Sequence, residues 1–85
     1  MKEIRIIGLL ITDRIKEAGR TQEVLTRYAH LVRSRLGFHE VTENVCSRAG
    51  VILIQVSGTP GDCKALVEAL RDIGGIEVQQ MLFTL

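Results

Sequence analysis

The fold of this chain is decided by the stretch VILIQV at residues 51–56, whose apolar side chains fall on both faces of an extended chain. A short, β-branched apolar run that is soon followed by a glycine is typical of a strand in the middle of a sheet. The segment IRIIGLLI at residues 4–11 has the same character and is followed by polar residues. The sequence therefore predicts two strands that are apolar on both faces.

Two helices are predicted, one after each of these strands. The second starts at Thr-Pro-Gly-Asp, residues 59–62, because Thr caps a helix, Pro fits its first turn and an acid stabilises its positive end. It ends at Gly74 and Gly75. The polar residues 13–20, ahead of the first helical stripe, are interpreted as a loop or a frayed first turn. The two apolar stripes with helical spacing are Thr21, Val24, Leu25 and Tyr28, then Cys63, Leu66, Val67 and Leu70.

Residues 30–36 fit two structures. They could continue the first helix, with Gly37 as its cap, or form a strand. As a strand they would place Leu31, Arg33 and Arg35 on one face and Val32, Ser34 and Leu36 on the other. Periodicity alone leaves both structures open.

Residues 76–85 are predicted to form the last strand, and the polar residues 39–50 a long hairpin connection. On the last strand the predicted faces are Ile76, Val78 and Leu82 on one side, and Met81 and Phe83 on the other.

With residues 30–36 taken as a strand, the order strand, helix, strand, strand, helix, strand predicts the α+β class. Its form is a ferredoxin-like βαββαβ sandwich, a four-stranded antiparallel sheet with two helices on one face. Residues 1–85 leave room for one domain. In this topology the first and third strands are central, which agrees with their two apolar faces.

Two helices cover only one face of such a sheet. Apolar patches above roughly 300–600 Å² usually mark an interaction surface, so we predict a homo-oligomer, a dimer or a tetramer, closed over the open face. The alternative is a hydrophobic sheet shielded in part by Arg33, Arg35 and Gln79. The predicted interface residues are Ile7, Leu9, Ile11, Met81 and Phe83, with Leu53 or Ile54 joining them according to register.

Composition argues against several classes of function. A net charge of +1 at pH 7 is unlike that of proteins that bind DNA or RNA through phosphates. RNA-recognition sheets carry aromatic residues on their first and third strands, where this chain has Ile, Leu and Val. The sequence has no signal peptide and no apolar run of the ~18 residues that a membrane helix needs, so we expect a cytoplasmic protein. No nucleophile with a base, no carboxylate pair and no phosphate loop is found, so we expect no enzyme.

Three motifs follow one another along the chain: Asp13-Arg14, then YAHLVRSRLG at residues 28–37, then Gly-Gly-Ile-Glu-Val at residues 74–78. With them the sequence resembles the small ACT-like proteins called iron-only hydrogenase system regulators. The resemblance implies that residues 30–36 form a strand. It also implies a regulatory protein similar to the ligand-sensing domain of nickel-responsive repressors, with no catalytic residue and no cofactor to carry over. The pattern departs at Phe38-His39, which replaces an apolar-Pro pair, and along residues 39–50, which are longer than usual.

The resemblance also bears on partners. Nickel-responsive repressors contact DNA through a separate arm, whereas this chain begins at its first strand. An effect on transcription is therefore expected to pass through a protein partner, with no direct contact to nucleic acid.

A small-molecule site is implied at the loop after the first strand, where ACT-like modules bind effectors against a neighbouring subunit. The matching residues are Asp13, Arg14, Gly19 and Arg20. Gly19 would let a ligand approach the backbone, and the arginines would bind a carboxylate or phosphate. The alternative is a solvated loop in which Asp13 caps a turn.

A metal-responsive binding protein is the alternative function. The closely spaced His residues that nickel-sensing relatives carry on the second strand are absent, and Cys63 is expected to act as a small buried hydrophobe. His39 and Cys46 are then the one pair placed together in a polar segment. We predict no metal, and a non-catalytic regulator whose signal is a small-molecule effector or a protein partner.

Overall fold

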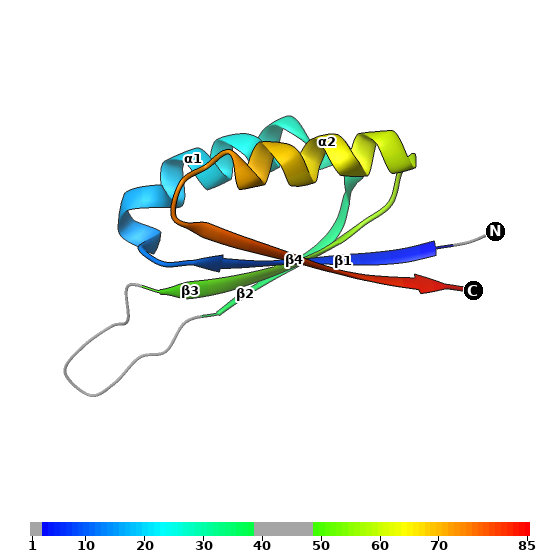
Figure 1. Ribbon diagram of the computed structural model, residues 1–85, viewed down its shortest axis with the longest axis horizontal. Coiled ribbons are helices and arrows are strands. Elements are labelled where there is room, and N and C mark those ends of the chain that lie inside the picture. The colour runs from blue at the N-terminus through cyan, green and yellow to red at the C-terminus, as the bar shows by residue number, and fades with distance from the viewer. Residues whose placement is uncertain (1–2, 39–48) are drawn as a thin grey trace.

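The computed structural model describes residues 3–38 and 49–85, apart from the side chains of Arg14 and Phe38. Figure 1 shows two helices above one sheet. The elements in chain order are β1 (Glu3–Ile11), α1 (Arg14–Arg27), a short 3-10 helix η1 (Ala29–Leu31), β2 (Val32–Phe38), β3 (Gly50–Val56), α2 (Pro60–Arg71) and β4 (Ile76–Thr84).

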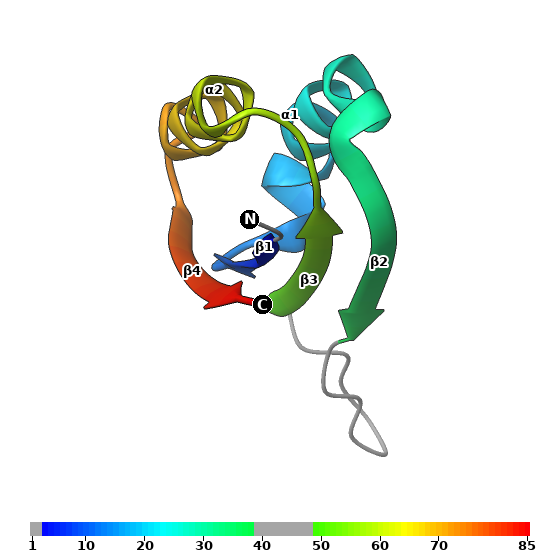
Figure 2. The same cartoon turned by 90° about the vertical axis from the view of Figure 1, so that its right-hand side faces the viewer.

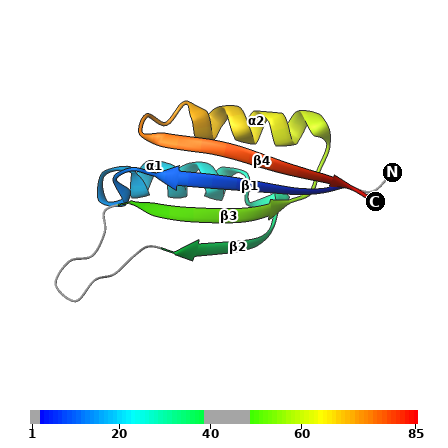
Figure 3. The ribbon, with the colours of Figure 1, turned by 60° about the horizontal axis from the view of Figure 1, so that its bottom comes forward.

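The four strands form one antiparallel sheet in the order β2-β3-β1-β4 (Figure 3). Both helices pack on the same side of it, and no described element covers the other side (Figure 2). The two segments that are apolar on both faces, β1 and β3, are the central strands. The predicted α+β class and ferredoxin-like order are therefore confirmed.

Helix α1 begins earlier than the sequence pattern indicates. The side chain of Asp13 accepts hydrogen bonds from the backbone N–H groups of Ile15 and Lys16, both at 3.2 Å. This cap satisfies two of the amides that a helix start leaves unpaired, so the helix forms through Gly19 in spite of that residue's low helix propensity. The interpretation of residues 13–20 as a loop is wrong, although Asp13 does act as a cap, at the start of α1.

Helix α2 starts as its sequence predicts. The hydroxyl of Thr59 accepts a hydrogen bond from the backbone N–H of Asp62 at 3.1 Å, and Pro60 occupies the first helical position. After the helix, Gly75 adopts a φ of +83°, a backbone conformation that L side chains rarely adopt. That turn leads the chain into β4.

Strand β2 confirms the extended interpretation only from Val32 onward, because Ala29–Leu31 forms η1. A bulge lies between Val32, which pairs with Val56, and Ser34, which pairs with Gln55. A bulge inserts one unpaired residue and shifts the alternation of side chains. Val32 therefore packs against the core while Ser34 lies on the opposite face, contrary to the predicted sharing of one face.

The core lies between the sheet and the helices. In β1 the odd-numbered residues point into it: Ile7 and Leu9 are 0% exposed and Ile11 is 3% exposed. The prediction that these three residues lie on the open face is wrong. A strand that is apolar on both faces carries no signal for which set of residues the helices will cover. The remaining buried apolar residues that form this core are Val24, Leu25, Leu31, Ile54, Val56, Cys63, Leu66, Val67, Leu70, Ile73 and Val78.

Candidate functional site

The uncovered side of the sheet, which we call the open face, is apolar over all four strands. Phe83 and Met81 are 50% and 54% exposed, and they lie there as the sequence predicts. Register also settles the earlier ambiguity, because Leu53 lies on this face while Ile54 is in the core. The apolar residues of the open face are Ile4, Ile6 and Leu10 of β1, Leu36 of β2, Val51 and Leu53 of β3, and Met81 and Phe83 of β4.

The polar residues of the open face are almost all neutral. Ser34, Gln55 and Gln79 share it with the apolar side chains. Glu77, near the start of β4, is the charged residue that the strand register assigns to it within the described part of the chain. A face of this kind presents little charge to a partner.

Gly8 leaves a hollow in the middle of the open face. The hollow has a volume of about 190 Å³ and is bordered by Leu10, Val51 and Gln79. A Cβ atom at Gly8 would stand 3.4 Å from Cδ2 of Leu53, so a side chain there would fill the depression. The open face therefore has a depression where the central strands β1 and β3 pair.

A larger depression, which we call the α1–β2 cleft, lies on the helix side of the sheet. Its volume is about 410 Å³. The helix contributes the rim and the strands contribute an apolar floor. The cleft is lined by Ile11, Ala18, Gly19, Thr21, Gln22, Arg35 and Ile52.

Two polar groups distinguish the α1–β2 cleft. Thr21 is 2% exposed, and its hydroxyl oxygen is buried with no hydrogen-bond partner. Arg35 projects toward α1, where Nη1 donates to Oε1 of Gln22 at 3.0 Å. Gln22 is itself fixed by a 3.3 Å hydrogen bond from Nε2 to the hydroxyl of Thr26. An oriented cation, and a residue whose hydroxyl is buried and unpaired, therefore border one apolar floor.

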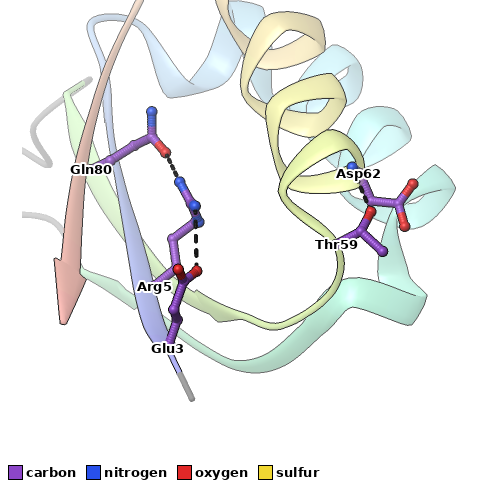
Figure 4. A network of polar contacts seen from close by, with 5 residues as sticks. All are labelled: Glu3, Arg5, Thr59, Asp62 and Gln80. Atoms are coloured by element: carbon purple, nitrogen blue, oxygen red, sulfur yellow. Dashed lines mark hydrogen bonds and ion pairs between the residues drawn. The ribbon is translucent and has the colours of Figure 1, made fainter. Parts of the chain in front are cut away.

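A second cleft, of about 310 Å³, lies beside the start of α2 and includes Arg5, Ser57 and Cys63 in its lining. Figure 4 shows the guanidinium of Arg5 between two partners: it donates to Oε1 of Gln80 at 2.9 Å and lies 3.9 Å from a carboxylate oxygen of Glu3. The same view shows the Thr59 cap of α2. Arg5 is already engaged within the fold.

The structure spreads the predicted ligand residues over different surroundings. Asp13 serves as the cap of α1, and the side chain of Arg14 lies outside the described part. Arg20 is exposed and its Nη1 lies 3.9 Å from Oε2 of the buried Glu17. Gly19 lines the α1–β2 cleft. The four residues lie at the cap and within α1, so they form no loop.

The predicted metal pair, His39 and Cys46, lies outside the described residues. His30 is exposed in η1 and stacks on Tyr28 with ring centroids 6.5 Å apart. Cys63 is 2% exposed within the core, as a small hydrophobe would be. Among residues 3–38 and 49–85, no three His, Cys, Asp or Glu side chains gather in a group that could hold a metal ion.

Sequence reasoning missed Gln22 and treated Thr21 only as part of a helical stripe. It considered Arg35 as a shield of the open face, whereas the residue lies on the helix side, paired with Ile54. The available signal was the position of Thr21, a hydroxyl in an otherwise apolar stripe. Arg35 carried no such signal, because the bulge after Val32 decides which way it points.

Neither protein-family models nor curated proteins match this chain. Among solved structures, the uncharacterized protein TM1266 from Thermotoga maritima has a TM-score of 0.81 at 20% identity, over 98% of this chain and 100% of that chain. CPII, a nitrogen regulatory PII-like protein from Thiomonas intermedia K12 bound to ADP, AMP and bicarbonate, has a TM-score of 0.53 at 11% identity, over 99% and 96% of the two chains. SnoaB, a cofactor-independent oxygenase from Streptomyces nogalater, has a TM-score of 0.55 at 12% identity, over 100% and 94%.

At these identities the likeness establishes the fold. One fold here hosts a regulator and an enzyme, so function must be argued from the surfaces of this chain. Within the part of the chain that the structure describes, no helix has both the length and the apolar character needed to cross a membrane.

Proposed function

We propose that this chain is a non-catalytic regulatory module of the ACT-like kind that works as a homo-oligomer, with the open face as the interface between copies. The observation that carries the proposal is the open face itself. Its apolar side chains extend over all four strands and no described element covers them. Water contact with such a surface is unfavourable in proportion to its area, and a partner removes that cost.

A second copy of the chain is the occupant that best fits this face. In a two-fold interface each residue meets the same surface on the other copy, so a charged face would repel itself. Among the described residues, the strand register gives the open face a single charged side chain, Glu77, which lies at one end of β4. The exposed Met81 and Phe83 offer bulky groups, and the hollow at Gly8 offers space to receive one.

The association state tests this proposal directly. Wild-type protein is expected to have the mass of a dimer or tetramer by light scattering. Phe83→Glu places a charge on the open face and is expected to give a single-copy species. Ile15→Glu is the matched control, because Ile15 is 66% exposed on α1, away from this face, and should leave the mass unchanged.

Circular dichroism keeps the association test independent of folding. Both substituted residues are at least half exposed, so both variants should retain the wild-type spectrum. A wild-type protein that keeps the mass of one chain at all concentrations would overturn the proposal. An oligomer that Phe83→Glu leaves intact would show that copies meet elsewhere.

We further propose a cytoplasmic role in regulating hydrogenase or iron–sulfur metabolism through a protein partner. The support is the sequence resemblance to iron-only hydrogenase system regulators over the full chain, together with the regulatory role of the PII-like protein that shares the fold. Deletion of the gene in its source organism is expected to change hydrogenase activity or transcript levels. A deletion strain with wild-type levels of both would contradict this role.

A further inference from the structure

The α1–β2 cleft has the size and lining of a small-ligand site. Its volume of about 410 Å³ falls in the range of roughly 300–1,000 Å³ that such sites occupy. Gly19 has open space around the position where a Cβ would lie, so no side chain narrows the cleft at this point of α1. Ile11 and Ile52 form the floor, and a few polar groups stand at the edge. An apolar lining with a small number of placed polar groups is typical of ligand pockets.

The positive charge in the lining of the cleft favours a negatively charged ligand. Arg35 is the charged side chain of its described lining. Gln22 accepts one hydrogen bond from this guanidinium and holds it over the cleft, while a guanidinium has five N–H donors in total. Arginine binds carboxylates through two parallel hydrogen bonds, which suits a planar anion.

Thr21 supplies an observation that does not depend on charge. A buried hydroxyl without a hydrogen-bond partner destabilises the folded state, and most buried polar groups in proteins are paired. The hydroxyl oxygen of Thr21 is buried and unpaired, in a residue that lines the cleft. Rotation of the Thr21 side chain toward the cleft would let an oxygen of a bound molecule pair with this hydroxyl.

The lining also narrows the kind of anion. It holds a single cation and lies along the middle of α1, away from the helix start where phosphates bind. Its described residues include no acid that could pair with an ammonium group. The apolar floor of Ile11 and Ile52 favours an aliphatic body. These features disfavour nucleotides, inorganic phosphate and amino acids.

We propose that the α1–β2 cleft binds a small aliphatic monocarboxylate, with Arg35 on the carboxylate, Thr21 as a second hydrogen-bond donor, and Ile11 and Ile52 against the hydrocarbon. This inference rests on the proposed function as a binding module and gives its ligand a chemical class. The cleft lies on the helix side of the sheet, so ligand binding and self-association can each fail without the other.

Titration with isovalerate, followed by amide chemical shifts, tests the inference. Isovalerate is expected to shift the amides of Gly19, Thr21 and Ile52, while isovaleramide, leucine and inorganic phosphate should shift them far less. Arg35→Gln is expected to weaken binding by about tenfold or more. Arg33→Gln is the matched control on the same strand, because Arg33 bonds Ser57 outside the cleft, and it should bind as wild type does.

Thr21→Val gives the second, independent test. Valine has the shape of threonine without the hydroxyl, so the variant should be at least as stable as wild type while binding isovalerate several-fold more weakly. A loss of stability would show that the hydroxyl is paired in the free protein and would overturn its role. Absence of isovalerate shifts in wild type, equal shifts with isovaleramide, or equal weakening in Arg33→Gln would overturn the inference itself.

Discussion

Ile6 and Ile7 are identical side chains on neighbouring positions of β1 with opposite surroundings. Ile7 is 0% exposed between the sheet and the helices, whereas Ile6 is partly buried on the open face. The stability lost when an isoleucine is truncated grows with the number of packing contacts that the resulting cavity removes. The two positions therefore separate core packing from interface packing in one strand.

Ile7→Ala is expected to lower the free energy of unfolding by about 2–5 kcal/mol, because it leaves a cavity in the core. Ile6→Ala should cost clearly less in the same dilute sample and should act mainly on the association of copies. Urea denaturation at low protein concentration measures the first effect, and light scattering measures the second. Equal losses of stability in the two variants would contradict the placement of Ile7 in the core and Ile6 on the open face.

Gly74 and Gly75 offer a second matched pair at the residue scale. Gly75→Ala is expected to lower the free energy of unfolding by about 1–2 kcal/mol, since Gly75 has a φ of +83° and an L residue is strained there. Gly74 has a negative φ and open space around its Cβ position, so Gly74→Ala should change stability by less than about 0.5 kcal/mol. Thermal or urea unfolding of both variants measures the two losses of stability. A larger loss for Gly74→Ala than for Gly75→Ala would contradict the prediction.

At the scale of elements, the helix starts depend on single capping oxygens. Thr59→Ala is expected to lower the free energy of unfolding by about 0.5–2 kcal/mol, because the backbone N–H of Asp62 loses its acceptor. Thr59→Ser keeps the oxygen and should retain most of the wild-type stability. Denaturation of the three proteins under one condition measures the difference, and equal stability of the Ala and Ser variants would exclude a capping role.

The two helices differ in how well their starts could be predicted. Thr59, Pro60 and Asp62 fall in the order that a helix start requires, and α2 begins there. The start of α1 was missed because Gly19 and the polar side chains around it weaken the apolar stripe. Its cap, Asp13, acts through a local hydrogen bond that outweighs the propensity of one glycine.

Strand β2 shows a second limit at this scale. The resemblance to a known family correctly indicated a strand in this region. Alternation correctly placed Ser34 and Leu36 opposite Arg35 but put Val32 on the wrong face. The bulge between Val32 and Ser34 forms only when β2 pairs with β3, so no property of β2 alone reveals it. The position of Arg35 beside α1 follows from that bulge.

At the scale of the whole molecule, association through the open face should make thermal stability depend on protein concentration. The melting temperature of wild type is expected to rise with concentration, since a partner stabilises the folded state by mass action. Phe83→Glu should melt at one temperature across the same series, and Ile15→Glu should follow wild type. Concentration-independent melting of wild type would argue against the interface.

The chemistry of that interface predicts its response to salt. The open face is apolar and nearly neutral, so ions have few charges to screen. Raising the salt concentration is expected to leave the oligomer intact, and light scattering in low and high salt measures this. Dissociation in high salt would point to an interface built on charged surfaces instead.

Local composition and spacing were enough to predict the central place of β1 and β3 and the start of α2. The order of elements also needed the family resemblance, which indicated a strand at residues 30–36. The sequence also placed Met81 and Phe83 on one face of the last strand. The side of β1 that the helices cover is set by packing in the folded chain, since Ile6 and Ile7 are equally apolar and either could be buried. The tertiary structure likewise joined α1 to Arg35, because that neighbourhood arises from strand pairing across distant parts of the chain.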